Sequence, residues 1–447
     1  MVKFVPDLFH NRSATRDFLV SHTDDIIHEG EPGPHPAALT ADLPDLLDRQ
    51  GLEKAIETQM ASATSLGVIA IHIEPPLTEK YGSEESINDQ QETMVADPIV
   101  SIVTHPSAGK GIWGRMGPDR FACAMAGLNE KDAQALAETL LQSGKKTGNI
   151  DITIGMSVYP TLHYTRRQTL ENAEKALDHS AFFGPGTITL FDAVSLNISG
   201  DRRYQTGDIE GAIDEFKNGL LIDPANANLH NSLGVCYGVL EDYDRALAAF
   251  EKAHGLSEDV MAIYNKGYIL LLKGENGQAL TCLLEANARE PDVFEVVFHI
   301  GQIYMEMDQA GNARPFLEAA SRANNRSGAA FRNLGTCLDK LGLTKEAIQA
   351  YKSAVKINPE DTLSLSTLGR LYTKRKESLD VAVVLCQQSV RLDPDNGHYR
   401  HRLGEAYLSQ GKLEDALSSF EAAVKRGHDS HSLVEETQDR LLAAKAS

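Results

Sequence analysis

The second half of the chain repeats one pattern of small, apolar and polar residues about every 34 positions. Glycines recur at intervals of 33 to 35 residues, and an alanine follows each of them about twelve residues later. These glycines are Gly200, Gly234, Gly267, Gly301, Gly335, Gly369 and Gly404. A period of this length is typical of stacked helix pairs, in which a small residue lets two helix backbones cross closely. Because one pair cannot bury its apolar face alone, the pairs stack into one core and present one long surface.

Seven units follow this frame, and several positions in them agree at once with tetratricopeptide repeats (TPRs). The units run over residues 193–226, 227–259, 260–293, 294–327, 328–361, 362–396 and 397–430. Leu-Gly pairs such as Leu233-Gly234 recur, and prolines such as Pro224 stand where the second helix of a unit must end. The array therefore resembles an all-α TPR solenoid, which implies protein binding rather than catalysis. Residues 431–447 predict one further helix that caps the last unit.

Before residue 193 the pattern changes to alternating strands and helices. Apolar runs predict strands at residues 67–74, 121–127, 150–159 and 187–191. Amphipathic stretches predict helices at residues 43–56, 131–143 and 168–181. This alternation indicates an α+β domain with one sheet covered by helices. We expect the domain at residues 41–192, after an irregular lead-in and linker at 1–40 and before the TPR units at 193–430.

Four landmarks in this domain resemble those of a GGDEF domain, the fold of bacterial diguanylate cyclases. In chain order they are Leu43–Arg49, Arg115–Phe121, Thr153–Gly155 and Ala173–Leu177. They stand where the family has its opening motif, its signature turn, the following strand and the last helix. The resemblance implies a sheet that carries a nucleotide site, and it allows a homodimer through this domain.

The residues that would carry the cyclase reaction are largely replaced. In that family, carboxylates hold divalent metal ions on the GTP triphosphate. The positions concerned are His72 for the first metal aspartate, Lys80 near the guanine-contacting asparagine, and Gly117, Pro118, Asp119 and Arg120 in the signature. Only Asp119 keeps a carboxylate at the metal site, and Pro118 removes an N–H where the turn must meet the nucleotide. We therefore expect an inert domain with no catalytic residue, no metal and no cofactor.

This domain leaves two other interpretations open. A receptor could bind GTP or cyclic di-GMP without turnover, with Arg120 meeting phosphate in place of a metal and with Asp119 and Lys80 beside it. An active diguanylate cyclase is less favoured, because metal, base and phosphate contacts are lost together. Our main hypothesis is a protein-interaction scaffold in bacterial signalling or complex assembly.

Composition narrows the partners and the compartment. The formal net charge is −20 with acidic residues spread along the chain, whereas nucleic-acid binding needs a concentrated basic face. No uncharged apolar run reaches about 18 residues, so no membrane span is expected, and the N-terminus lacks an apolar signal region. The five cysteines contain no CxxC pair, which fits a reducing cytoplasm.

Candidate partner-binding residues lie on the first helices of the units. The inner positions of the last three units carry the basic residues Arg332, Lys340, Arg370, Lys374 and Arg402. Arginine grips carboxylates through its fork geometry, so this strip predicts a protein or peptide partner with an acidic or C-terminal carboxylate motif. The alternative is a set of ordinary solvated charges. Earlier in the array the same face carries Tyr264, Tyr268 and Phe298, which are either a peptide anchor or inner packing.

Overall fold

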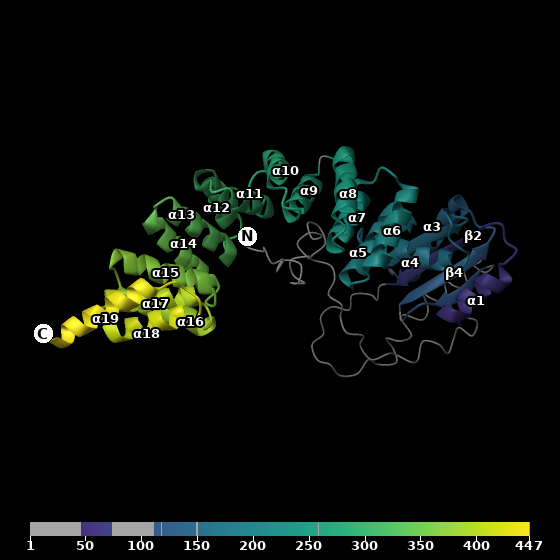
Figure 1. Ribbon diagram of the computed structural model, residues 1–447. Helices are drawn as coiled ribbons and strands as arrows, with labels where there is room; N and C mark the ends of the chain where they lie inside the picture. Colours follow the sequence, from purple (N-terminus) through teal and green to yellow (C-terminus); the bar gives the residue numbers. More distant parts are fainter. Residues whose placement is uncertain (1–45, 74–110, 118, 149–150, 258, 447) are drawn as a thin grey trace, which may run out of the picture. The chain divides into compact units, whose positions relative to one another are not determined.

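The computed structural model describes residues 46–73, 111–117, 119–148, 151–257 and 259–446. The chain divides into two units, Met1–Glu258 and Asp259–Ser447. In the first unit, a mixed sheet and its covering helices precede two helix pairs, and the described residues of the second unit form helices alone (Figure 1).

Within the described residues, six strands form one sheet in the order β1-β3-β4-β2-β5-β6. They are β1 (Leu47–Asp48), β2 (Leu66–Ile73), β3 (Ile112–Arg115), β4 (Arg120–Ala126), β5 (Ile152–Tyr159) and β6 (Ile188–Leu190). The central strand β2 pairs antiparallel with β4 and β5, and β3 pairs antiparallel with β4. The two outermost pairs, β1 with β3 and β5 with β6, are parallel.

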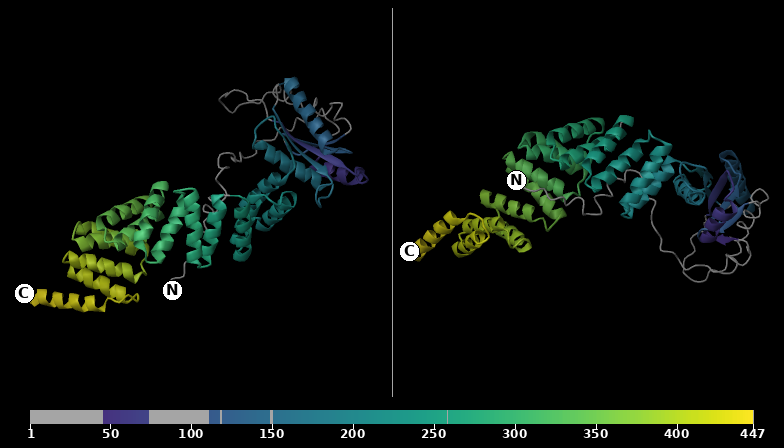
Figure 2. Two further views of the ribbon diagram at one scale, coloured as in Figure 1. Left: turned by 90° about the horizontal axis from the view of Figure 1, so that it is seen from above. Right: turned by 45° about the vertical axis from the view of Figure 1, so that its right-hand side comes forward.

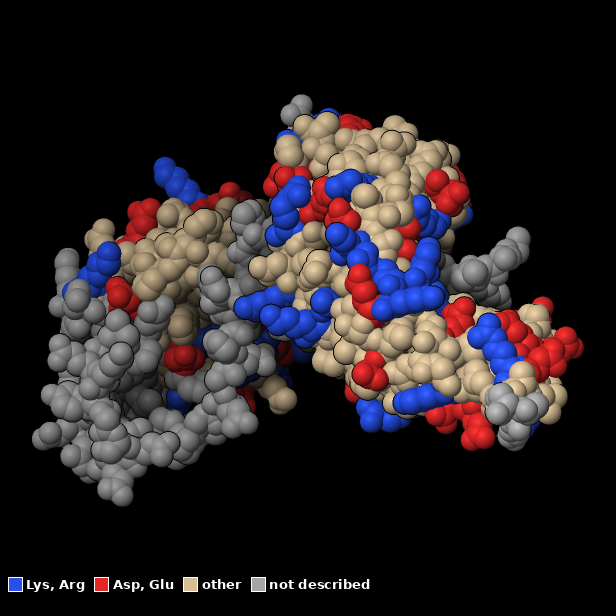
Figure 3. Space-filling view, turned by 90° about the vertical axis from the view of Figure 1, so that its left-hand side faces the viewer, with Lys and Arg blue, Asp and Glu red and all other residues tan. Residues whose placement is uncertain are grey.

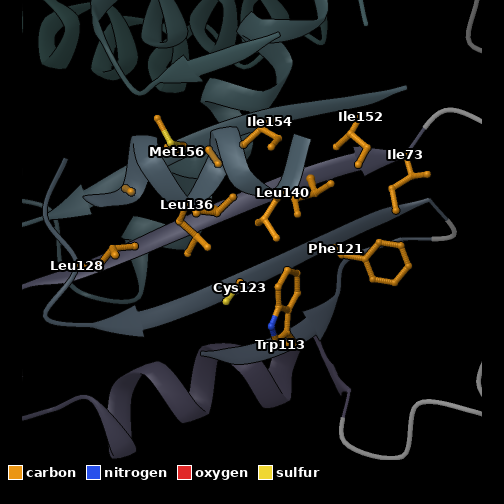
Figure 4. Close-up of a cluster of buried hydrophobic side chains, with 14 residues drawn as sticks. Ile73, Trp113, Phe121, Cys123, Leu128, Leu136, Leu140, Ile152, Ile154 and Met156 are labelled. Atoms are coloured by element: carbon orange, nitrogen blue, oxygen red, sulfur yellow. The ribbon is translucent and has the colours of Figure 1, made fainter. Parts of the chain in front are cut away.

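Side-chain alternation along β2 divides the core between the two faces of the sheet. The covering helices are α1 (Arg49–Gln59), α3 (Glu130–Gly148) and α4 (Gln168–Ala181). Ile69 belongs to the cluster under α3, where Leu136 and Leu140 pack against Ile154 of β5 (Figure 4). Val68 belongs to the opposite cluster, which α1 and α4 cover. Both faces of the sheet are therefore buried under helices.

The sequence pattern located most of these elements. The four predicted strands are confirmed as β2, β4, β5 and β6, with ends displaced by at most two residues. The helix expected at residues 43–56 is wrong at its start. Asp48 accepts a hydrogen bond from the Gly51 N–H at 2.7 Å and caps α1, so α1 begins at Arg49 and Leu47–Asp48 forms β1; residues 43–45 lie outside the described ones. Strand β3 was not predicted.

From residue 193 onward, the described residues form seven helix pairs and one final helix, which confirms the expected helical solenoid. We call the two helices of each pair helix A and helix B. The helices are α5 (Ala193–Gln205), α6 (Ile209–Ile222), α7 (Ala227–Val239), α8 (Tyr243–Leu256), α9 (Val260–Leu272), α10 (Asn276–Arg289), α11 (Phe294–Glu306), α12 (Ala310–Ala323), α13 (Gly328–Lys340), α14 (Thr344–Ile357), α15 (Thr362–Arg375), α16 (Leu379–Leu392), α17 (Gly397–Ser409), α18 (Leu413–Val424) and α19 (His431–Ala446). Within each of the two compact units of the chain, consecutive helices lie side by side (Figure 2).

The periodic glycines lie where helix A crosses helix B. A Cβ atom added to Gly234 would lie 2.5 Å from a ring carbon of Phe250, and one added to Gly404 would lie 2.5 Å from a ring carbon of Phe420. Real Cβ atoms do not approach other atoms this closely. The glycine therefore lets the aromatic ring of helix B fill the crossing.

We predict that Gly234→Ala destabilises the fold by about 1–3 kcal/mol, because the added methyl group overpacks the crossing with Phe250. Gly255→Ala is the matched control, since nothing lies within 4 Å of a Cβ added to this glycine near the end of α8. The control should be neutral or stabilise by up to about 1 kcal/mol. Urea unfolding followed by circular dichroism measures both, and equal stability of the two variants would contradict the packing argument.

In the first unit, the sheet domain and the first helix pair share a core. Tyr164, Phe191 and Leu196 form one buried cluster that links the end of the sheet to α5. Beside it, the Lys175 Nζ on α4 donates hydrogen bonds to both carboxylate oxygens of Glu215 on α6, at 2.7 and 2.8 Å. The first TPR unit therefore packs directly on helix α4 of the sheet domain.

A buried carboxyl group lies between α5 and α7. Asp201 accepts a hydrogen bond from the Asn197 side-chain amide at 3.1 Å, while its other oxygen, Oδ1, is buried without a hydrogen-bond partner among the described residues. The hydroxyl of Tyr204, one turn further along α5, is buried in the same way. Burial raises the pKa of Asp201 from 3.8 to about 7, since the charged form loses its hydration.

The protein should therefore become less stable as the pH rises from about 4 to about 7. The folded-state pKa of Asp201 lies above its unfolded value, so its contribution is fully present below about pH 4 and is lost as the pH rises through about 7. Asp201→Asn should remove this loss and stabilise the protein at pH 8 by on the order of 2–4 kcal/mol. Thermal melts of both proteins between pH 4.5 and 8 measure the difference, and parallel pH profiles would contradict the assignment.

Candidate functional site

The basic residues predicted on the last three helix A segments are mostly paired within the protein. The Arg332 Nη1 on α13 donates to Asp361 at 3.2 Å, and the Lys340 Nζ donates to Asp308 at 2.7 Å. Arg370 on α15 donates to Asp339 on α13. Lys374 is exposed near the C-terminus of α15. Three of the five expected cations are thus neutralised by carboxylates of the array itself. In the view of Figure 3, basic and acidic side chains lie interspersed on the surface.

Arg402 on α17 differs from the other arginines. Its Nη1 donates to the hydroxyl oxygens of Ser366 at 3.1 Å and Thr367 at 3.0 Å on α15, and its Nε is buried without a hydrogen-bond partner among the described residues. Burial, and then the nearby charge of Arg370, lower the pKa of Arg402 below its usual value. A partly buried guanidinium held by hydroxyl groups is a site where a carboxylate would be stabilised.

The aromatic residues of the third and fourth helix pairs pack against one another. Tyr264 is 1% exposed and Tyr268 is 7% exposed, and both rings lie within about 6 Å of the ring of His299 on α11. Phe298 is half-buried and contacts the same histidine ring edge-on. Burial lowers the pKa of His299 to about 4, so this ring is neutral at physiological pH. The burial of both tyrosines favours inner packing, and Phe298 is the more accessible of the three predicted anchors.

On the sheet, the two residues at the expected metal position bind each other. The His72 Nε2 on β2 hydrogen-bonds the Asp119 carboxylate at 2.9 Å. This bond holds the pKa of Asp119 below its usual value. Within the described residues, no group of three or more His, Cys, Asp or Glu side chains is arranged to hold a metal ion. Lys80 and Pro118 lie outside the described residues, whereas Gly117 belongs to the turn between β3 and β4.

Arg120 begins β4 and is also engaged. Its Nη1 lies 3.5 Å from the Asp178 Oδ1 on α4. Asp178 forms a second, shorter ion pair with Arg202 on α5. The Arg120 side chain is 45% exposed. It could therefore meet an anion from solvent, but the anion would compete with Asp178.

The sequence interpretation missed the carboxylates that pair with the basic strip and a cluster of histidines at the last unit. The acidic partners Asp308 and Asp339 stand near the ends of the helix A segments α11 and α13, and Asp361 ends the unit 328–361, so a signal was present in the alignment of units on the 34-residue frame. His398 and His401 are three residues apart on α17 and meet His428 from the following connection. Only the first two of these histidines fall inside a helix that the repeat pattern predicts.

Known TPR models match the helical array. A TPR repeat model matches residues 200–238, and tetratricopeptide repeat models match residues 227–259, 294–326, 328–361 and 375–431. Three of these ranges begin at residues where the sequence period places the start of a unit.

Relatives among curated proteins match the chain in part. It is 25% identical over 214 residues to the BBSome complex member BBS4 of Bos taurus, which covers 45% of this chain and 41% of that protein. It is 29% identical over 194 residues to Protein FlbA of Caulobacter vibrioides, which covers 42% of this chain and 31% of that protein. The chain therefore matches less than half the length of these two relatives.

Solved structures match at low identity. PilF of Pseudomonas aeruginosa is 23% identical and has a TM-score of 0.42, with 46% of this chain and 95% of that chain covered. YrrB, whose structure is described as that of a TPR protein with an unusual peptide-binding site, is 19% identical and has a TM-score of 0.39, with 42% and 96% covered.

In the part of the chain that the structure describes, no helix has the length and apolarity needed to cross a membrane. The family models match at the residues where the structure shows stacked helix pairs. The helical array is therefore built of tetratricopeptide repeats, and proteins with such repeats generally act by binding other proteins.

Proposed function

We propose that this protein is an interaction scaffold in which the TPR array binds a protein or peptide, and the sheet domain is a catalytically inert GGDEF-like domain. Arg402 carries this proposal, because it is a partly buried cation whose partners within the described chain are hydroxyl groups. The partner would supply a carboxylate, from an acidic side chain or from its C-terminus. Signalling or complex assembly in a bacterium is the setting we infer.

The packing of two landmarks supports the GGDEF-like assignment. Gly155 of the Thr153–Gly155 landmark lies in β5, and a Cβ added there would lie 2.0 Å from the backbone nitrogen of Leu177 and 2.3 Å from the carbonyl oxygen of Ala173. These two residues end and begin the Ala173–Leu177 landmark on α4. The two landmarks therefore depend on the same close contact between helix and strand, which explains why they occur together.

The state of the signature residues supports the loss of catalysis. A divalent metal needs free carboxylate oxygens, but Asp119 is hydrogen-bonded to His72, which stands at the position of the first metal aspartate. We infer that GTP with Mg²⁺ or Mn²⁺ yields no cyclic di-GMP above a heat-killed control. Product formation measured by chromatography would overturn the inert assignment.

Arg402 provides the test of partner binding. A fluorescent acidic peptide with a free C-terminus should bind the full-length protein, and Arg402→Ala combined with Arg370→Ala should weaken it about tenfold or more, since a charged hydrogen bond contributes about 1.5–3 kcal/mol. Added salt should weaken it as well. Fluorescence anisotropy measures the affinity.

Lys356→Ala is the matched control for that experiment, because it removes an exposed cation from helix B of the same region. It should leave the affinity within about twofold, since single surface charges contribute little. Equal affinity of the wild type and the Arg370/Arg402 double variant would contradict binding at Arg402. It would favour the helix A face around Phe298 as the binding surface.

A second candidate function is nucleotide binding without turnover, which the exposed guanidinium of Arg120 next to Asp119 favours. Calorimetric titration with GTP and with cyclic di-GMP distinguishes this receptor from a purely structural domain. Binding that Arg120→Ala abolishes would support the receptor, and the absence of heat and of a thermal shift at millimolar ligand would exclude it.

A further inference from the structure

Three histidines and one serine form a hydrogen-bonded cluster at the last repeat. His398 and His401 lie on α17, and His428 and Ser430 lie in the connection between α18 and α19. The His398 Nδ1 lies 3.2 Å from the His428 Nε2, and the His428 Nδ1 lies 3.0 Å from the Ser430 Oγ. The His401 Nδ1 lies 2.8 Å from the same hydroxyl oxygen, and Ser430 is 1% exposed. We call these four residues the histidine cluster.

The histidine cluster attaches the start of α19 to α17. The rings of His401 and His428 lie 4.4 Å apart between centroids, and Gly397 at the start of α17 lets the connection come close, since a Cβ there would lie 2.9 Å from the Cβ of His428. Helix α19 also packs against α18: Thr437 is buried and Leu433 and Val434 are half-buried, whereas Leu442 is 67% exposed. The hydrogen bonds of the cluster therefore add a polar attachment at the start of this final helix.

The cluster can hold only a limited number of protons while all of its hydrogen bonds stay intact. Each of its three hydrogen bonds holds one hydrogen atom, so the rings can be neutral with every bond made. One additional proton on His398 or on His428 still leaves every bond intact. When both of these rings are charged, however, two N–H groups face each other across the 3.2 Å gap and that hydrogen bond is lost.

The surrounding charges act in both directions: Arg402 disfavours protonation of the cluster, whereas Glu405 and Asp429 favour it. On α17, Arg402 and Glu405 act on the cluster, and Asp429 acts on it from the connection. From α15, the side chains of Ser366 and Thr367 hold Arg402, and Arg370 adds a further positive charge near it. The His401 Nε2 lies 3.7 Å from a carboxylate oxygen of Glu405.

We propose that the histidine cluster is a pH-sensitive latch that holds α19 on the last TPR unit at neutral pH and releases it in mild acid. Burial lowers the pKa of His398 to about 4, with further lowering by Arg402, His428 and His401, and burial likewise lowers the pKa of His428. Both folded-state values lie below the unfolded value, so the attachment is complete above about pH 6.5 and is lost as the pH falls toward 4. This inference does not depend on which partner the array binds.

Hydrogen–deuterium exchange of the full-length protein, corrected for the intrinsic exchange rate and recorded with EDTA present, tests the latch. The protection of α19 should fall at least tenfold between pH 7.5 and pH 4.5, while the protection of α13 and α14 changes less than threefold. In His398→Gln, a neutral side chain replaces the ring, so the protection of α19 should depend on pH less steeply than in the wild type, since the lowered pKa of His428 still contributes. His431→Gln is the matched control, because His431 is exposed at the start of α19 and is not part of the cluster.

The exchange measurements on the wild type and the two variants either support the latch or overturn it. A selective loss at α19 in the wild type and in His431→Gln, together with a clearly weaker pH dependence in His398→Gln, supports the latch. The proposal is overturned if the wild type shows no selective loss at α19, or if His398→Gln loses protection with the same pH dependence as the wild type.

Discussion

The TPR array depends on the close crossing of two helices at a glycine. At Gly200, Gly234 and Gly404 an added Cβ would lie 2.3 to 2.5 Å from the phenylalanine ring that helix B places there. This contact sets how near helix B lies to helix A, and the stacking of pairs then sets which side chains of neighbouring repeats meet. The pairing of Arg332 with Asp361, which caps the start of the next helix A, and the placement of Arg402 against α15 both follow from this spacing.

The same spacing explains why most of the basic side chains in this strip are paired within the protein and not free to bind a partner. An arginine on one helix A lies within reach of the carboxylates on the neighbouring repeat, and at this short range an internal carboxylate competes well with any partner in solution. Arg370 with Asp339 is the clearest case. Arg402 differs because its guanidinium is hydrogen-bonded to serine and threonine on α15, while the carboxylate of Glu405 interacts with it through charge. Specificity for an anion would thus come from one position and not from the whole strip.

The sequence was sufficient for the helix pairs because the glycine–aromatic crossing recurs at a fixed interval. It was not sufficient for the charges, because Arg370 and Asp339 belong to different repeats and the type of each residue does not show whether it pairs or stays in solvent. Strand β3 was missed because Ile112–Arg115 is too short to show an alternation of apolar and polar residues. The histidine cluster was missed because His428 and Ser430 lie after the last helix pair, where the repeat frame no longer predicts contacts.

In the inert GGDEF-like domain that we propose, different residues would serve the fold and the chemistry. Gly155 is required by the backbone of α4, whichever side chains stand at His72 or Arg120. Helix α4 in turn supports the first TPR unit through the buried pair of Lys175 and Glu215. A substitution that damaged this packing would also damage the start of the array, whereas a substitution at the proposed nucleotide site would not. The packing residues of the proposed GGDEF-like domain are therefore tied to the array, whereas the residues of its proposed nucleotide site are not.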